Sequence, residues 1–153
     1  PNFLEDARGL SLSSIGIVFT LGALGNSLMA LTFSRFEPHR GYVVAQIFVA
    51  AFAALIWRGT GVATLAFGYF LLGGFRASRP LAMAQARAFV HPSQMGLTYG
   101  AMETINAMIY ILAPPLAGLI YENDPYMIYP LALALLAISI VVSAIVPRRL
   151  LHA

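Results

Sequence analysis

Long apolar stretches recur along the whole chain, and they constrain its fold more than any other feature. Of the 153 residues, 59% are hydrophobic and only 10% are charged, whereas a soluble domain carries about 25% charged residues. The mean hydropathy of +0.79 shows the same bias. Because a chain with so little polar surface is poorly suited to face water on all sides, we predict an integral membrane protein that lies in the lipid bilayer.

The thickness of the bilayer sets the length of each crossing. A hydrocarbon core about 30 Å thick needs roughly 20 apolar helical residues, and by this measure the sequence predicts about five spans. Their approximate bounds are residues 10–33, 41–57, 60–83, 95–120 and 126–146. Backbone polar groups must be hydrogen-bonded inside the membrane, and the segments lack the short alternating pattern of barrel strands. We therefore expect an all-α, polytopic helical bundle that forms a single transmembrane domain over residues 1–153.

The placement of arginines predicts the orientation of the spans. Most of them follow or end the first, third and fifth predicted spans, and these are Arg35, Arg40, Arg76, Arg79, Arg87, Arg148 and Arg149. Only Arg8 and Arg58 lie on the other side. Because cytoplasmic loops carry an excess of basic residues, we expect the C-terminus in the cytoplasm, the N-terminus outside and the cell membrane as the location. The predicted outer boundary also carries an aromatic belt of Trp57, Tyr121, Tyr126 and Tyr129.

The fourth predicted span carries a polar stripe. Its face at helical spacing consists of Gly96, Tyr99, Glu103, Asn106, Tyr110 and Ala113, while Met102 and Ile105 belong to the apolar remainder. A polar face on a membrane helix is expected to look into a bundle or a wet cavity rather than into lipid. Near the outer end, Pro114 and Pro115 remove two backbone donors and predict a bend or break.

Glu103 is the only carboxylate well inside a predicted span. An ionised carboxylate near the middle of a membrane costs about 2.5 kcal/mol or more unless it is paired or protonated. Counting from the turn between the third and fourth spans places Arg76 at a matching depth, so we expect Arg76 as its partner and Arg79 as the second choice. Two roles stay open for Glu103: a structural ion pair, and a group that handles substrate or protons.

Small and polar residues in the other spans predict helix packing. A stripe along the first span would let another helix approach closely, and its members are Ser13, Gly16, Thr20, Ala23, Ser27, Ala30 and Ser34. The Gly73–Gly74 pair predicts close packing in the third span. Gln46 predicts a buried hydrogen-bonding position in the second span.

The sequence lacks the residue patterns of several other functions. It has no cysteine, which excludes disulfides, thiolate metal sites and cysteine nucleophiles. The predicted spans contain no histidine that could act as the base of an intramembrane hydrolase. The arginines form no block that would grip a nucleic acid. We therefore expect no enzyme activity, no cofactor, no metal ion and no nucleic-acid partner.

Three stretches resemble the C-terminal half of a major facilitator superfamily transporter. They are Pro1–Leu4 followed by Gly9–Ser11, similar to the outer loop that enters the eighth helix; Ser34–Gly41, similar to the second copy of the cytoplasmic acidic-Arg-x-Gly-basic-basic loop; and Ala113–Gly118, similar to the Gly-Pro-x-x-x-Gly stretch of the eleventh helix. In the second stretch Arg35 and Arg40 match the loop, whereas Ser34 replaces its acid and Glu37 its glycine. The resemblance maps the chain onto helices eight through twelve of that six-plus-six helix architecture.

This resemblance implies the C-terminal portion of a secondary active transporter that moves a small solute by alternating access, with a proton or ion where coupling is used. It implies a missing N-terminal half and a cytoplasmic gating loop that contains Arg35 and Arg40. The residues implied for the solute and proton pathway are Glu103, Asn106, Tyr99, Tyr110 and Arg76. The alternative is a non-transporting membrane scaffold or assembly protein whose polar helix faces are structural.

Overall fold

The computed structural model describes residues 3–87 and 89–150, and in this part of the chain it contains helices and no strands. Pro1 and Asn2 of the first family-like stretch lie outside the described residues. Four helical segments are long and apolar enough, by length and composition, to cross a membrane: Leu12–Phe33, Pro38–Arg58, Pro92–Asn123 and Ile128–Ile145. The prediction of an all-α membrane bundle is confirmed.

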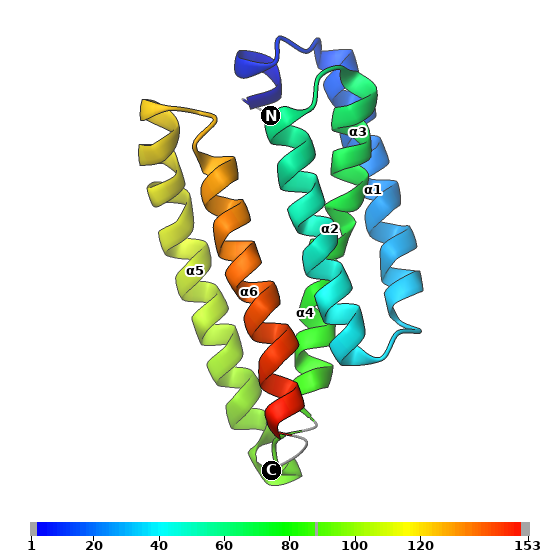
Figure 1. Ribbon diagram of the computed structural model, residues 1–153, viewed down its shortest axis with the longest axis vertical. Helices are drawn as coiled ribbons and strands as arrows, with labels where there is room; N and C mark the ends of the chain where they lie inside the picture. The colour runs from blue at the N-terminus through cyan, green and yellow to red at the C-terminus, as the bar shows by residue number, and fades with distance from the viewer. Residues whose placement is uncertain (1–2, 88, 151–153) are drawn as a thin grey trace.

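The helices run up and down the molecule (Figure 1). Their order is η1 (Phe3–Ala7), α1 (Leu12–Phe33), α2 (Pro38–Arg58), α3 (Val62–Leu71), α4 (Gly73–Ala86), η2 (Pro92–Gln94), α5 (Met95–Asn123) and α6 (Ile128–Leu150). The α1–α2 and α4–α5 connections lie at one end of the molecule, and the α2–α3 and α5–α6 connections lie at the other. The helix bounds therefore place the predicted loops on alternate ends.

The predicted third span, residues 60–83, corresponds to α3 and α4 together. A turn at Leu72 separates them, but Leu72 keeps helical dihedral angles (φ −58°, ψ −19°) and its N–H donates to the Gly68 carbonyl. Because only this one residue interrupts the helix, α4 continues in the direction of α3 (Figure 1). The pair extends to Ala86, three residues beyond the predicted end.

Local sequence explains where several helices begin. Ser11 caps α1, since its hydroxyl oxygen accepts a hydrogen bond from the Ser14 N–H at 3.3 Å. Pro38 is the first residue of α2, where a missing N–H leaves no helical bond unmade. Gly61 precedes α3 with a φ of +82°, a conformation that a residue with a side chain rarely adopts.

Arg8 holds the N-terminal segment against the end of α2. Its Nη2 donates to the carbonyl oxygens of Ile56 and Trp57, at 2.6 and 2.7 Å. The last carbonyls of a helix have no partner within the helix and carry partial negative charge, so a guanidinium is well suited to them. This contact connects the chain before α1 to the last turn of α2.

Glycines bring α1 into direct contact with the junction of α3 and α4. A Cβ atom placed on Gly25 would lie 2.1 Å from the Phe70 carbonyl oxygen, and one placed on Gly73 would lie 2.6 Å from the carbonyl carbon of Gly25. A Cβ on Gly74 would lie 2.9 Å from the carbonyl oxygen of Ala45 in α2. The close packing predicted for Gly73–Gly74 is therefore confirmed, because only residues without a side chain allow backbones to approach this closely.

The small-residue stripe of α1 is not the surface that contacts α3 and α4, so it does not serve as a packing face within this chain. All seven members of the stripe are exposed. The buried positions of α1 are instead Ile15, Val18, Gly25, Met29 and Phe33. The larger apolar side chains decide the packing face, since Ile15 and Val18 fill one core cluster and Met29 and Phe33 fill another, with Gly25 between them.

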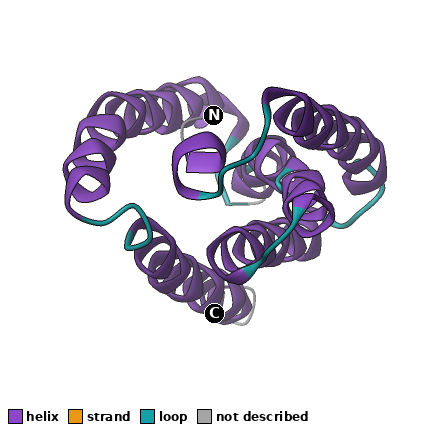
Figure 2. Ribbon diagram, turned by 90° about the horizontal axis from the view of Figure 1, so that it is seen from above, coloured by secondary structure: helices purple, strands orange, loops and turns teal. Residues whose placement is uncertain are grey.

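The last two helices are attached to the bundle in different ways. α6 packs on α2, where the 5% exposed Gln46 donates from Nε2 to the Ser139 hydroxyl at 2.9 Å. The predicted buried position of Gln46 is confirmed. α5 has no buried residue, and the view from above shows it away from the group formed by α1 to α4 (Figure 2). α5 therefore lies beside the bundle rather than inside it.

Gly25→Ala is expected to destabilise the fold, because the added methyl group would overlap the Phe70 carbonyl oxygen at 2.1 Å. Overpacking typically costs about 1–3 kcal/mol, so the midpoint of thermal unfolding in detergent should fall. Gly16→Ala is the matched control in the same helix, since its Cβ would meet nothing within 4 Å and alanine favours a helix interior. Equal unfolding midpoints for the two variants would contradict the backbone contact.

Candidate functional site

A cavity of about 670 Å³ lies between α4 and α5, and Tyr42 of α2 also contributes to it. Its lining residues are Tyr42, Phe75, Arg76, Ser78, Arg79, Ala82, Met83, Met102, Ile105, Asn106 and Tyr110. Sites for small molecules commonly measure about 300–1,000 Å³ and combine apolar walls with a few polar groups. Both the volume and the lining therefore suit a small solute.

One face of α4 forms the first wall of this cavity. The lining positions 75, 76, 78, 79, 82 and 83 recur at helical spacing. The opposite face of α4 is buried and consists of Gly73, Gly74, Ala77 and Leu81. Since the buried face packs against α1 and α2, the arginines of α4 are turned toward α5.

Three of the five predicted pathway residues line the cavity together. Arg76 comes from α4, and Asn106 and Tyr110 come from α5. Met102 and Ile105 lie beside them, although sequence reasoning assigned both to the apolar remainder of this helix. On α4, Phe75, Ser78, Ala82 and Met83 were also missed. Phe75, Ala82 and Met83 lie three or four residues from Arg79, and this helical spacing was the signal that could have found them.

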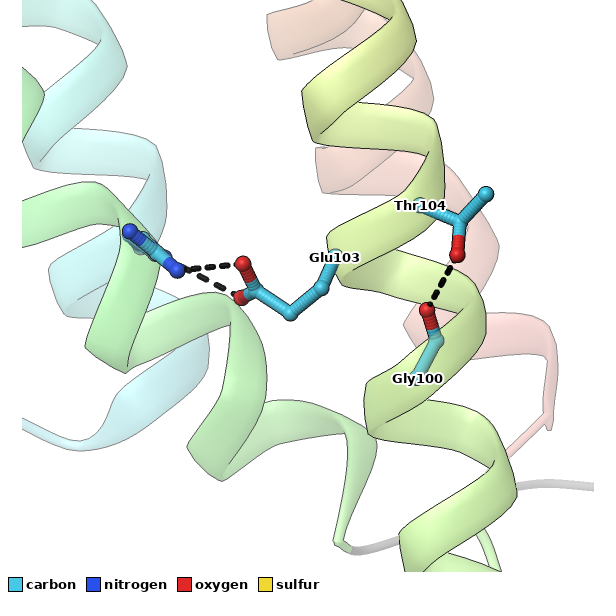
Figure 3. A network of polar contacts seen from close by, with 4 residues as sticks. Gly100, Glu103 and Thr104 are labelled. Carbon is cyan, nitrogen blue, oxygen red and sulfur yellow. Dashed lines mark hydrogen bonds and ion pairs between the residues drawn. The ribbon is translucent and has the colours of Figure 1, made fainter.

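Glu103 reaches from α5 toward α4 (Figure 3). Arg79 Nε donates to Oε1 of Glu103 at 3.2 Å, and Arg79 Nη2 donates to Oε2. The expectation of Arg76 as the first-choice partner is wrong, and the second choice, Arg79, is the partner. Arg79 lies seven residues before the end of α4, and Glu103 lies eight residues after the start of α5. Because η2 and the turn belong to neither helix, the depth of Glu103 matches that of Arg79 better than that of Arg76.

Arg76 lines the same cavity without a hydrogen-bond or ion-pair partner among the residues that the structure describes. The charged groups at the cavity are therefore two guanidinium groups, of Arg76 and Arg79, and the carboxylate of Glu103. Because Glu103 balances Arg79, one positive charge remains. Inside a membrane such a charge is costly unless water or an anion accompanies it.

Tyr99 belongs to a different polar contact, and the structure does not bring it into the cavity lining. Its hydroxyl accepts a hydrogen bond from Arg87 Nε at 2.6 Å and lies 3.5 Å from the Met83 carbonyl oxygen. Arg87 follows the last residue of α4, and Tyr99 is in the second turn of α5. Tyr99 therefore joins these two helices near their connection.

The residues of the predicted gating loop lie where α1 meets α2. Arg40 Nε lies 3.2 Å from Oε2 of Glu37, and both side chains are largely exposed. Arg35 is also exposed. In the first turn of α2, His39 Nδ1 lies 3.3 Å from Nε2 of Gln85 in α4. This contact connects the loop region to the helix that carries both cavity arginines.

α5 continues without interruption through Pro114–Pro115, so of the predicted bend or break the break is wrong and the bend stays a prediction. The carbonyls of Tyr110 and Ile111 lose their helical donors to these prolines, but the remaining bonds keep the helix intact, as in other membrane helices. Pro80 in α4 likewise removes the donor to the carbonyl of Arg76. Two cavity residues, Arg76 and Tyr110, thus have backbone oxygens without a helical donor.

The fold and the cavity together define an integral membrane protein with a site of solute size. The chain matches the Major Facilitator Superfamily over residues 1–152 and belongs to this family. The family is one of helical membrane bundles that transport solutes, and its members are in general not enzymes. No curated protein and no solved structure matches the chain.

Removing one charge of the Glu103–Arg79 pair is expected to destabilise the protein more than removing both. Glu103→Gln leaves the positive charge of Arg79 unbalanced, and Arg79→Gln leaves the negative charge of Glu103 unbalanced. The double variant contains neither charge. The two side chains are 41% and 57% exposed, so the coupling should be small, because solvent screens an exposed ion pair. Thermal unfolding in detergent measures it.

The matched control combines Glu103→Gln with Arg76→Gln, since no contact joins these two side chains. The effects of these two substitutions on thermal unfolding are expected to add in this control. Additive effects in the Glu103–Arg79 cycle as well would contradict the ion pair.

Proposed function

We propose that this chain is the C-terminal portion of a secondary active transporter and that the cavity between α4 and α5 belongs to its solute path. The observation that carries the proposal is the meeting of Arg76, Asn106 and Tyr110 at one cavity of about 670 Å³, in a member of a transporter family. In this proposal a missing N-terminal half forms the facing wall, as expected for a site between two halves near the middle of the membrane.

Alternating access requires helices that move relative to one another, and the attachment of α5 supports such movement. α5 buries no residue in this chain. Long side chains join it to α4 and the residue after α4, through Glu103 with Arg79 and Tyr99 with Arg87. Because few packed contacts would be lost, α5 can shift against α4 at low cost.

The proposed topology has five crossings, with α3 and α4 together as the third. The N-terminus and the α2–α3 and α5–α6 connections then lie outside, and the α1–α2 and α4–α5 connections lie in the cytoplasm of a cell with this protein in its plasma membrane. This arrangement keeps Arg35, Arg40 and Arg87 on the cytoplasmic side. It keeps Trp57 and Tyr121 at the outer boundary.

Glu103 is the candidate for coupling transport to a proton. Protonation of its carboxylate would remove the negative charge that balances Arg79, and Arg79 would then be available to a solute or to another acid. A transporter could use this exchange to link proton binding to solute binding. The coupling proton is thus a further part of the proposal.

A structural scaffold is the second candidate. It is favoured by the observation that two of the predicted pathway residues, Glu103 and Tyr99, bind side chains of the neighbouring α4 segment rather than open space. Under this alternative, Arg76→Gln and Asn106→Ala would leave the assembly of the protein with its partners unchanged.

Glu103→Gln in the full-length protein is expected to abolish or uncouple transport while expression stays near the wild-type amount, because glutamine keeps the shape of the side chain but carries no proton. Uptake of the solute identified by screening expressing cells, measured with and without a pH gradient, tests this. Loss of folded protein that Arg79→Gln restores would show instead that the pair is structural.

Cysteines introduced at Glu122 and at His39 test the topology, since the chain has no cysteine of its own. An impermeant thiol reagent applied to intact cells is expected to label position 122, which lies near the outer end of α5 in the proposed topology. Position 39 should react only after the cells are opened. Labelling of position 39 in intact cells would overturn the orientation.

A further inference from the structure

We propose that the cavity accepts a small organic anion with one negative charge and that Arg76 binds its acidic group. This inference rests on the proposed solute path and specifies its substrate class. The inference follows from the charges at the cavity. Glu103 neutralises Arg79, and the positive charge of Arg76 is left for the solute.

The position of Arg76 in the helix excludes the usual alternative for an arginine in a membrane segment. An arginine near a helix end can extend its side chain to the polar interface. Arg87, which follows α4, lies at such an end, whereas Arg76 lies close to the middle of the α3–α4 pair, Val62–Ala86. Arg76 is therefore far from both interfaces, and its charge needs a partner within the cavity.

The surrounding groups suit an acidic group better than an amine. The planar guanidinium of Arg76 can donate two parallel hydrogen bonds to a carboxylate or a similar oxyanion. The Asn106 amide also faces the cavity and has no hydrogen-bond partner among the described residues, so it can donate a further one. A cation would meet two guanidinium groups, and the carboxylate of Glu103 already binds Arg79.

The rest of the lining sets the character of the solute body. Phe75, Met83, Met102 and Ile105 are apolar and line the same cavity as the polar groups. Methionine side chains adapt to different shapes. The cavity therefore favours an anion with an apolar or aromatic body over a small inorganic ion, which would leave these walls without contact.

Charged thiol reagents can measure this preference without knowledge of the natural solute. Ile105→Cys places a thiol in the cavity wall, in full-length protein whose other cysteines are replaced. Two methanethiosulfonate reagents, one with a sulfonate and one with a trimethylammonium group, are applied to membrane vesicles. Their rate ratio at the introduced thiol, divided by the same ratio for a free thiol in solution, reports the charge selectivity of the path.

The expected ratio favours the sulfonate reagent. Arg76→Gln should lower it about tenfold, the effect of one unit charge in partly aqueous surroundings. Arg76→Lys should keep most of it, and Glu103→Gln should raise it by releasing Arg79. Arg58→Gln, which removes an exposed arginine at the end of α2, is the matched control and should leave the ratio unchanged.

The outcomes separate the two proposals. If neither reagent modifies the thiol at position 105 in folded protein, the cavity has no aqueous path, and both the solute path and the anion site are overturned. If both reagents react and Arg76→Gln leaves the ratio unchanged, the path stands and the anion site is overturned.

A measurement with native Arg76 covers the case in which Arg76→Gln does not fold. Benzoate, benzamide and benzylamine have the same ring and differ in charge. Benzoate is expected to slow the reaction of the thiol at position 105 with the uncharged reagent N-ethylmaleimide more than the other two do. Equal protection by all three, stronger protection by benzylamine, or no protection by any of them would overturn the anion site.

Discussion

The backbone contact between α1 and the α3–α4 junction determines much of the remaining structure. Gly25 and Gly73 leave no room for a Cβ atom, and Gly74 makes a similar contact with α2. These contacts fix the rotation of α4 about its own axis. Because Ala77 and Leu81 are then buried, the face that carries Arg76 and Arg79 is directed toward α5. The charged cavity is thus a consequence of close glycine packing on the other side of the same helix.

The two cavity arginines illustrate how one helix face can carry groups with different roles. They lie three residues apart, yet only Arg79 meets an acid. The Glu103–Arg79 pair joins α5 to α4, whereas Arg76 lines the cavity without an ion-pair partner among the described residues. α5 itself buries nothing in this chain. Long polar side chains position it against α4, as Glu103 does through Arg79.

The sequence predicted the helices well and their contacts less well. Hydropathy predicted helices where the structure has them, and two residues of the polar stripe of α5, Asn106 and Tyr110, line the cavity. Tyr99 shares that stripe but binds Arg87. Sequence spacing assigns residues to one face of a helix, but it does not show which residues of a neighbouring helix each of them contacts. The predicted partner of Glu103, Arg76, lies one helical turn from the observed partner, Arg79. The length of the α4–α5 connection decides which residues of the two helices meet at the same depth.

The amino-acid sequence by itself determined that this chain is a helical membrane protein, because its apolar stretches match the bilayer and its backbone must be hydrogen-bonded internally. It also determined the family, through matches along the chain. Only the tertiary structure decided which face of each helix is covered. The small-residue stripe of α1 stays exposed while Ile15 and Met29 are buried. Periodicity places residues on a face, but the volume and shape of neighbouring side chains decide which faces pack.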